Sequence, residues 1–385
     1  MRVYLDNATS TKVDDKVLEA MIPFFREYYA LPSSQFAHSY GIEVNDRINE
    51  AREFIATKLG ASSPEEIVFT SGGTEANNFV IKGIAYANIE RGKHIIVSSI
   101  EHLSIIESAR KLQKEGFEVT YLPVDSEGLV DLSILEKSIR DDTVLVSIQV
   151  GNHETGTIQN LNAIGNIVKG KGVLFHTDAA IAWPYINLAP SNYGIDLMTI
   201  SPHKFHGPKG IGILYIKRGT KITKFIDGGF NEFNLRAGSE NTPGIIGARK
   251  AIETFSEDDV KKIKRLKELL MENIRKDIPD VELNGSEDNA LPHILNYTFK
   301  YVEGEAISLR LDFEGIAVTT GSACYSRNLQ ASYILLAMGK THEESHGSIR
   351  FSFSRFNTEE EILYTASKLK EIVEDLRRLS PLGKE

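Results

Sequence analysis

The chain has 385 residues, a formal net charge of −9, 41% hydrophobic and 25% charged residues, and one cysteine. This composition is typical of a globular protein, excludes a fibrous or disordered chain, and the length favours two domains. A negative chain without a polybasic tract argues against direct nucleic-acid binding, and no apolar run is long enough to span a membrane. Because a lone cysteine cannot form an internal disulfide, we expect a reducing, cytoplasmic setting.

Short apolar runs alternate with amphipathic stretches through the first two thirds of the chain. The runs predict strands at residues 67–70, 95–98, 119–122, 144–148, 173–175, 197–200 and 211–216. The stretches at 104–115, 132–140 and 161–169 are long enough to be crossover helices. Since the strands are apolar on both faces, the pattern predicts an α/β fold. Its large domain, over residues 15–255, would have three layers and a mainly parallel sheet.

The pattern changes after residue 255. A charged amphipathic helix is predicted at 260–276, followed by strands at 293–299, 316–319 and 348–353 and a helix at 359–378. Residues 1–14 and 256–385 are therefore assigned to a smaller α+β domain. No low-complexity linker separates the two parts, so we expect them to pack together.

Lys204 lies in the loop Ser201-Pro202-His203-Lys204, directly after the predicted strand at 197–200. In an open α/β sheet, ligands bind at the carboxyl ends of the strands. A partly desolvated lysine at that edge has a lowered amine pKa, which favours a Schiff base with an aldehyde cofactor. The loop therefore indicates a lysine that holds such a cofactor.

Asp178 ends another predicted strand, 26 residues before Lys204, so one strand–helix–strand unit could bring both to the same edge. Pyridoxal 5′-phosphate (PLP) needs a carboxylate against its pyridine nitrogen to keep the ring protonated. The pair of residues thus favours PLP as the cofactor.

A strand also runs through glycines into a helix at Thr70-Ser71-Gly72-Gly73-Thr74. Backbone N–H groups at that helix start, with the Thr74 hydroxyl, can bind a phosphate. His102 follows the strand at 95–98, where an imidazole could stack on a cofactor ring and move protons. Together with Lys204 and Asp178, these residues predict a PLP site along one sheet edge.

The motifs resemble those of the class V aminotransferase group of fold-type I PLP-dependent transferases, and within it the cysteine desulfurases that serve iron–sulfur cluster assembly. The resemblance covers nearly the whole chain. It is carried by 70–75 (Thr-Ser-Gly-Gly-Thr-Glu), 201–204 (Ser-Pro-His-Lys) and 321–326 (Gly-Ser-Ala-Cys-Tyr-Ser). It implies a homodimer that takes sulfur from L-cysteine, releases L-alanine and donates the sulfur to an acceptor or iron–sulfur scaffold protein.

The resemblance also assigns roles. Lys204 would hold the cofactor, Asp178 would face the pyridine nitrogen, and His102 would stack and transfer protons. The residues implied to hold the phosphate are Gly73, Thr74, Ser201, His203 and, from the second subunit, Ser239. The substrate carboxylate would bind Arg350, whose planar guanidinium suits it, with Asn152 beside it.

Cys324 would receive the sulfur as a persulfide. Its surroundings from Gly321 to Gln330 are rich in glycine, serine and polar residues, which favours an exposed loop over a buried thiol. A mobile loop would let the same sulfur reach the cofactor and then an acceptor. The spacing to Arg350 resembles the long-loop branch of the family.

Three departures from the family pattern stand out. His153 replaces an asparagine that normally touches the PLP phenolic oxygen and the substrate carboxylate, and Ile181 replaces a glutamine that donates to the same oxygen. Isoleucine cannot donate a hydrogen bond, so His153 would have to supply that contact. In the segment that is usually Gly-Gly-Gly-Gln-Glu-Arg, Phe230 and Phe233 would reshape the entrance.

The departures leave two alternatives open. One is a related PLP lyase or aminotransferase with a changed substrate, and the other is a non-catalytic paralogue that serves as a binding subunit. Retention of Lys204, Asp178 and Arg350 argues against the second. The histidine pairs 203/206 and 342/346 have ligand-like spacing, but both lie in stretches that the PLP hypothesis already explains, so we predict no metal site.

Overall fold

The computed structural model describes residues 1–321 and 331–380. Its central element is a seven-stranded sheet in the order β2-β8-β7-β6-β5-β3-β4. The strands are β2 (Ile67–Thr70), β3 (His94–Ser98), β4 (Glu118–Leu122), β5 (Thr143–Ser147), β6 (Leu174–Asp178), β7 (Leu197–Ile200) and β8 (Gly212–Ile216). All seven strands predicted from the apolar runs are present.

Pairing in this sheet is parallel from β4 through β3, β5 and β6 to β7, whereas β8 is antiparallel to both β7 and β2. The chain passes from β7 to β8 without a crossover helix, which is why β8 reverses direction. β2 then runs in the same sense as the parallel strands. The loops after β2, β3, β5, β6 and β7 therefore all leave the sheet at one edge.

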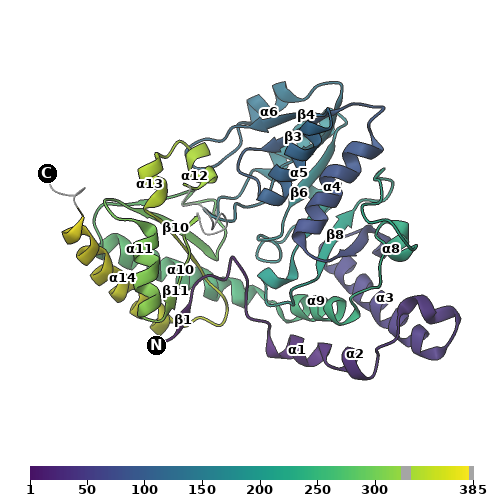
Figure 1. The fold of residues 1–385 in the computed structure, drawn as a ribbon, viewed down its shortest axis with the longest axis horizontal. Coiled ribbons are helices and arrows are strands. Elements are labelled where there is room, and N and C mark those ends of the chain that lie inside the picture. Colours follow the sequence, from purple (N-terminus) through teal and green to yellow (C-terminus); the bar gives the residue numbers. More distant parts are fainter. Residues whose placement is uncertain (322–330, 381–385) are drawn as a thin grey trace.

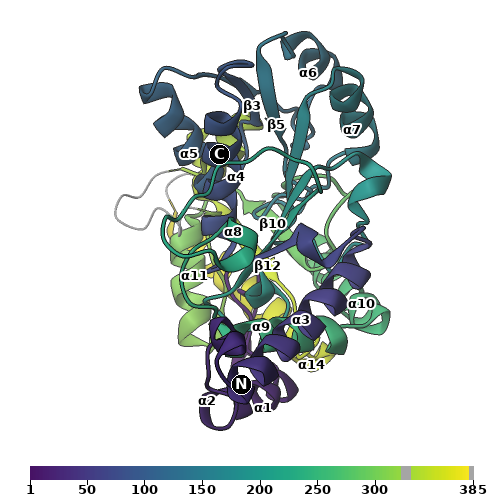
Figure 2. The ribbon, with the colours of Figure 1, turned by 90° about the vertical axis from the view of Figure 1, so that its right-hand side faces the viewer.

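Helices cover both faces of the sheet. Alternate residues of one strand face opposite layers: Ile95 and Val97 pack with α4 (Gly73–Ala87) and α5 (Leu103–Lys114), and Ile96 packs with the other side. The second layer contains α3 (Ser39–Leu59), α6 (Leu132–Ser138), α7 (Leu161–Gly170) and α9 (Thr242–Thr254). Figure 2 shows β3 and β5 between α4 and α5 on one side and α6 and α7 on the other. The three-layer prediction is confirmed.

The chain ends build a second body of structure beside this sheet (Figure 1). Its antiparallel sheet has the order β12-β10-β9, from β9 (Val281–Leu283), β10 (Ile294–Phe299) and β12 (Ser348–Ser352). Around it lie α10 (Glu257–Asp277), α11 (Gly304–Phe313), α12 (Tyr333–Ala337), α13 (His342–His346) and α14 (Glu359–Leu379). At the N-terminus β1 (Val3–Tyr4) pairs in parallel with β11 (Ile316–Ala317). The exact division into domains at residue 255 stays a prediction.

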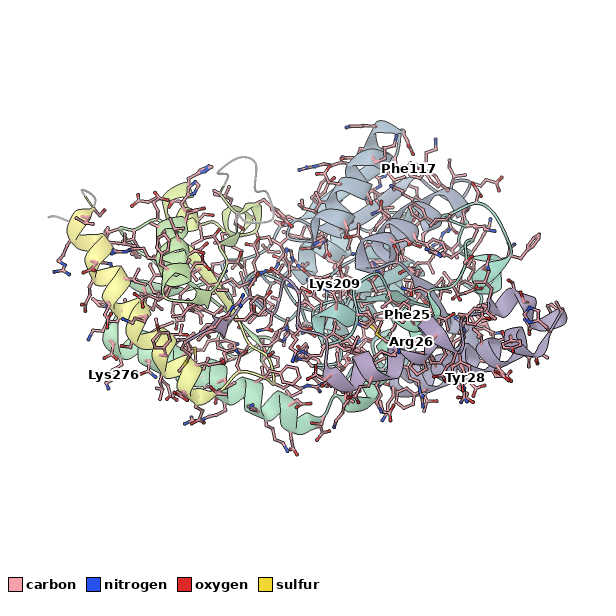
Figure 3. All side chains as sticks on the ribbon, turned by 60° about the horizontal axis from the view of Figure 1, so that its bottom comes forward. Phe25, Arg26, Tyr28, Phe117, Lys209 and Lys276 are labelled. Carbon is pink, nitrogen blue, oxygen red and sulfur yellow. The ribbon has the colours of Figure 1, made fainter. Side chains whose placement is uncertain are left out.

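The remaining helices are α1 (Asp15–Met21), α2 (Pro23–Arg26) and the short α8 (Asn231–Asn234). In Figure 3, Tyr28 near α2 and Lys276 on α10 lie at opposite ends of the molecule. No helix among the described residues is both long enough and apolar enough to cross a membrane.

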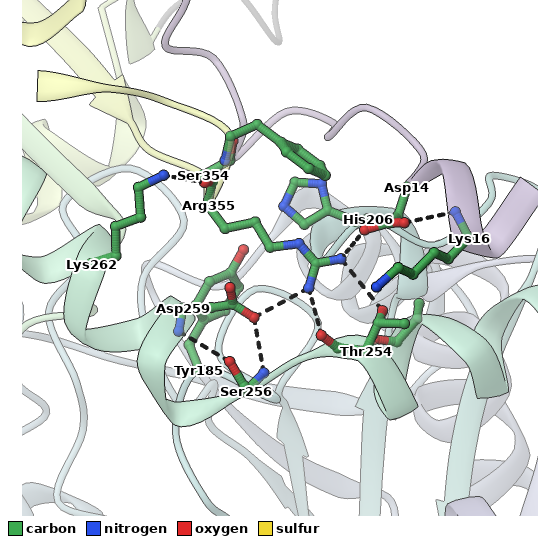
Figure 4. A network of polar contacts seen from close by, with 12 residues as sticks. Asp14, Lys16, Tyr185, His206, Thr254, Ser256, Asp259, Lys262, Ser354 and Arg355 are labelled. Atoms are coloured by element: carbon green, nitrogen blue, oxygen red, sulfur yellow. Dashed lines mark hydrogen bonds and ion pairs between the residues drawn. The ribbon is translucent and has the colours of Figure 1, made fainter. Parts of the chain in front are cut away.

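Arg355 joins the two bodies of structure (Figure 4). Arg355 lies in the loop before α14, and its guanidinium pairs with Asp14 at the N-cap of α1. The guanidinium also donates a hydrogen bond of 2.8 Å to the carbonyl of Thr254 at the end of α9. It also pairs with Asp259 on α10 at 3.2 Å. These ionised bonds are largely buried, and together they fix the N-terminal segment against the C-terminal part of the chain.

Candidate active site

A cavity of about 310 Å³ opens at the sheet edge where the five loops meet. It contains most of the residues predicted to form the site: Gly73, Thr74, His102, His153, Asp178, Ser201, His203, Lys204 and Arg350. Ile181 and the N-terminal residues Ala8 and Thr9 also line it. The fold thus gathers an amine, a carboxylate, a guanidinium and a helix start in one enclosure.

Lys204 enters the cavity from a short 3-10 turn, Pro202–Lys204, directly after β7. Its ammonium Nζ donates to the carbonyls of Ala8 at 2.6 Å and Thr9 at 2.8 Å. The carbonyl of Lys204 accepts from the Tyr185 hydroxyl at 3.0 Å. Tyr185 therefore holds the backbone of Lys204, while the N-terminal segment holds its amine.

Asp178 is the last residue of β6 and is only 7% exposed. Its Oδ1 accepts from the backbone N–H of Ala180 at 2.8 Å, and its Oδ2 accepts from the Asn77 side chain at 2.7 Å. Both carboxylate oxygens thus accept a hydrogen bond, which fixes the orientation of the group. The group fits the role of an anion facing a protonated ring nitrogen.

The residues predicted to bind the phosphate lie around the start of α4. Gly72 has φ of 155°, which favours glycine, and the helix has no side-chain cap, so its first N–H groups are available for an anion. A Cβ on Gly212 would lie 2.5 Å from the Thr70 hydroxyl and 2.6 Å from the Gly72 carbonyl carbon, so only glycine lets β8 approach this turn. Ser201 is buried beside Gly73.

His203 also lines the cavity. Its Nδ1 is 3.2 Å from the Ser10 hydroxyl. Burial, with Lys204 and Lys209 nearby, lowers the pKa of His203 to about 4. At neutral pH this imidazole is therefore neutral, and it can donate or accept a hydrogen bond beside a bound anion without adding a charge.

Two histidines of the cavity lining, His102 and His153, lie edge to face, with ring centroids 5.2 Å apart and planes at 68°. Burial lowers the pKa of His102, with opposing effects from Asp178 and Lys204. Burial also holds the pKa of His153 well below its usual range, and the neighbouring His102, Arg350 and Lys204 lower it further. The buried Nδ1 of His153 has no hydrogen-bond partner.

Arg350 projects from β12 and is 4% exposed. Its guanidinium donates to the His153 carbonyl at 2.8 Å, to Asp6 at 2.9 Å and to the Thr9 hydroxyl at 2.8 Å, while its Nε has no partner. A substrate carboxylate would thus share this cation with Asp6. Sequence reasoning missed Asp6, because it lies 344 positions from Arg350.

Asn152 does not contact the cavity. Its Oδ1 accepts from the N–H groups of Glu154 at 2.8 Å and Thr155 at 2.9 Å, and its Nδ2 donates to the Ile100 carbonyl at 3.2 Å. The side chain therefore closes the turn that presents His153. The geometry gives the expected substrate contact no support, because the amide is already occupied by backbone groups.

Ser239 also lies apart from the cavity, on an exposed stretch of the same chain. It lines a separate surface cavity of about 670 Å³ together with Phe230, which is 84% exposed, and Phe233. Cys324 lies outside the described residues. Asn77 and Ser104 were not predicted, although Asn77 lies only three positions after Thr74.

Comparison with known proteins decides the family. Residues 3–364 match the model of the family described as aminotransferase class-V. The chain is 48% identical over 386 residues to the cysteine desulfurase IscS of Dictyoglomus turgidum, covering 100% of this chain and 97% of the relative. The chain belongs to the aminotransferase class-V family and, within it, to the cysteine desulfurases.

Solved structures agree with this assignment. One, described as a NifS-like protein, superposes with a TM-score of 0.91 at 40% identity, covering 98% of this chain and 100% of that one. Another, described as SspA in complex with cysteine, gives a TM-score of 0.83 at 35% identity over 92% of this chain and 100% of that one. The predicted fold-type I architecture is confirmed.

Enzymes of this family depend on PLP, and the cavity fits that cofactor. The buried Asp178 carboxylate, the Lys204 amine and the uncapped start of α4 line one enclosure and match the ring nitrogen, aldehyde and phosphate. The unpartnered Nδ1 of His153 offers one further polar contact. Ile181 lines the cavity as well, and it supplies no donor to the phenolic oxygen.

Proposed function

We propose that this chain removes sulfur from L-cysteine, giving L-alanine and a persulfide on Cys324. The observation that carries the proposal is that Lys204, Asp178 and Arg350 line the same cavity of about 310 Å³. An amine for the cofactor, an anion for its ring nitrogen and a cation for an amino-acid carboxylate are what this reaction requires. The Cys324 sulfur bonds to the substrate sulfur, the bond from that sulfur to the substrate's β carbon breaks, and the thiol proton ends on that carbon to give alanine.

PLP, when bound, supplies an electron sink that weakens bonds at the substrate's α and β carbons. The protein's own residues do the rest. Arg350 orients the substrate through its carboxylate, assisted by Asp6 and Thr9, which hold the guanidinium in place. Asp178, oriented by Asn77 and the Ala180 N–H, would face the ring nitrogen. The Lys204 amine would move a proton at the substrate.

Cys324 enters the proposal from the sequence alone. Only the thiolate is a good nucleophile, so its attack on the substrate sulfur requires loss of the thiol proton. The polar composition of its segment favours access to both substrate and acceptor.

The test is to purify the protein with PLP, add L-cysteine and a thiol reductant, and measure alanine and sulfide. Wild type should form both, Lys204→Ala should lose the visible absorbance of bound PLP, and Cys324→Ser should lose both products. Lys209→Ala is a matched control, because Lys209 is an exposed lysine of the same loop. A PLP spectrum without alanine from cysteine would contradict the proposal and favour a changed substrate.

A PLP lyase or aminotransferase with a changed substrate is the second candidate, and Ile181 in the cavity lining favours it. In that case Cys324→Ser would keep full turnover of the true substrate. A preparation that PLP cannot reconstitute would instead support a non-catalytic subunit.

We further propose a homodimer that passes sulfur to an acceptor or iron–sulfur scaffold protein in the cytoplasm. Ser239 lines a surface cavity of its own chain, so a phosphate contact by this residue has to be made in a second copy. Light scattering of the purified protein tests the dimer. Ser239→Ala should weaken PLP binding there, whereas a monomer with full PLP affinity would contradict the proposal.

A further inference from the structure

Four polar side chains form a hydrogen-bonded row, Asp178, Asn77, Ser104 and His102, whose two ends are the groups expected to face the cofactor ring. The side-chain amide of Asn77, on α4, donates hydrogen bonds to the Asp178 carboxylate at 2.7 Å and to the Ser104 hydroxyl at 2.9 Å. The Ser104 hydroxyl lies 2.8 Å from Nδ1 of His102. Asn77 is 1% and Ser104 8% exposed, so the two bonds that Asn77 makes are shielded from water.

The hydrogens of this row can be assigned from donor counts. The Asp178 carboxylate only accepts, so the Asn77 amide nitrogen faces it, and the second amide hydrogen goes to Ser104. Turning the amide over would place its oxygen against the carboxylate. The Ser104 oxygen therefore accepts from Asn77, which leaves its single hydrogen for Nδ1 of His102.

The backbone closes the assignment. His102 is the N-cap of α5, and its Nδ1 also accepts from the N–H of Ser104 at 3.1 Å. An N–H group can only donate, so Nδ1 carries the lone pair, and the proton of the neutral ring is on Nε2. Two donors and the positive end of a helix thus face the same nitrogen.

We propose that Asn77 and Ser104 are positioning residues that lock His102 as the neutral Nε2–H tautomer, so that His102 serves the cavity as a hydrogen-bond donor and not as a base. The tautomer follows from the contacts alone; only the reaction in which His102 takes part rests on the proposed function. The proton-transfer role expected from the family resemblance stays a prediction, and the proposal narrows it: a neutral ring protonated on Nε2 can give that proton but cannot accept one there. For Nε2 to accept a proton, Nδ1 would need to keep its own proton against the Ser104 N–H.

The charges around His102 are consistent with a neutral ring. Asp178 on β6 favours the imidazolium, but Lys204 after β7 opposes it, and His153 after β5 faces the ring edge-on. Burial lowers the pKa of His102 more than either charge shifts it. Protonation of Nδ1 would in addition place its new N–H group against the N–H of Ser104, so that the hydrogen bond between them would be lost.

Nitrogen-15 labelling of histidine in the full-length holoenzyme tests the tautomer directly. His102→Gln identifies the signals by their loss. In wild type, Nδ1 of His102 should show the shift of an unprotonated nitrogen and Nε2 that of a protonated one. The midpoint for protonation should rise by roughly half to one pH unit in Ser104→Ala and Asn77→Ala, because a donor to the neutral form is lost.

Matched controls separate this effect from general loosening. Ser108→Ala removes another buried hydroxyl of α5, which bonds the Ser104 carbonyl at 2.7 Å, and Asn78→Ala removes the neighbouring amide of α4. Neither variant should move the His102 signals. Ser104→Thr keeps the hydroxyl and should give the signals of wild type.

A proton on Nδ1 in wild type would overturn the proposal without any variant. So would shifts in Ser104→Ala no larger than those in Ser108→Ala. These signals do not depend on turnover. A holoenzyme that shows the expected tautomer but forms no alanine from cysteine would contradict the proposed function and leave the inference intact.

Discussion

The cavity has two walls of different construction. On the wall formed by the ends of β6 and β7, both carboxylate oxygens of Asp178 accept hydrogen bonds and Lys204 donates two. On the opposite wall, formed by β12 and the loop after β5, Nε of Arg350 and Nδ1 of His153 are buried without a partner.

Buried polar groups without partners cost free energy, so they are rare unless a ligand meets them. The sheet-edge wall holds its carboxylate and its amine in place before any ligand binds, which suits a permanent cofactor. The opposite wall is incomplete and is suited to a substrate that comes and goes. Each prediction below changes one wall and asks whether the effect falls on cofactor or on substrate.

The largest effect is expected at the sheet-edge wall. Lys204→Ala should reduce alanine formation from cysteine by about 10²–10⁴-fold, the range typical of a lost acid–base group. The loss should fall on kcat and on the visible absorbance of bound PLP. Lys209→Ala should keep both. Turnover of Lys204→Ala within tenfold of wild type would show that the first wall does not hold the reacting group.

Glu154 supports the opposite wall. It follows His153 and accepts from the Ser332 hydroxyl at 2.5 Å, and burial raises its pKa to about 7. The ordinary pKa of 4.5 applies when the chain is unfolded, so the folded state holds a proton more tightly. Stability from this group is full below about pH 4.5 and is lost as pH rises through 7.

Wild type should therefore lose on the order of 3 kcal/mol of unfolding free energy from this group between pH 5 and pH 8. Glu154→Gln cannot titrate and should lose correspondingly less. Urea unfolding at the two pH values, with PLP in excess, measures the difference. Glu90→Gln, at an exposed glutamate, should behave as wild type. Equal pH slopes in wild type and Glu154→Gln would refute the assignment.

Arg350→Lys tests the substrate role of the second wall. Lysine keeps the charge but loses the planar pair of donors, and about 2 kcal/mol of ionised hydrogen bonding corresponds to a roughly 30-fold rise in KM for L-cysteine. PLP absorbance should stay. Arg310→Lys, at a surface ion pair, should leave KM unchanged. A loss of PLP with unchanged KM would assign Arg350 to the cofactor wall instead.

The two walls also differ in how far the sequence predicts them. Asp178 and Lys204 lie within four residues of a strand end, so the alternation of strands and helices was enough to place them together. The bond from Arg350 to Asp6 spans 344 positions, and no local pattern indicates it.

The other features that the sequence did not predict depend mostly on side-chain hydrogen bonds. Asn152 was expected to touch substrate, yet its amide is used by the Glu154 and Thr155 N–H groups. The row through Asn77 and Ser104 depends on rotamers that periodicity does not report. The reversed direction of β8 likewise follows from a connection without a helix, which the apolar pattern of its strand could not show.

The smallest effect is expected from Ile181→Gln. Ile181 lines the cavity close to Asp178 in sequence, where the family pattern has a glutamine that donates to the PLP phenolic oxygen. A new donor should favour the ionised oxygen by about 1.5 kcal/mol and lower the midpoint of the pH-dependent change in PLP absorbance by about one unit.

Ile181→Leu is the matched control, since it keeps the size without a donor. The same titration in His153→Asn tells whether His153 supplies the contact in wild type. If it does, His153→Asn and Ile181→Gln should both move the midpoint, and the combined variant should not add the two shifts. Independent shifts would mean that His153, on the second wall, serves the substrate alone.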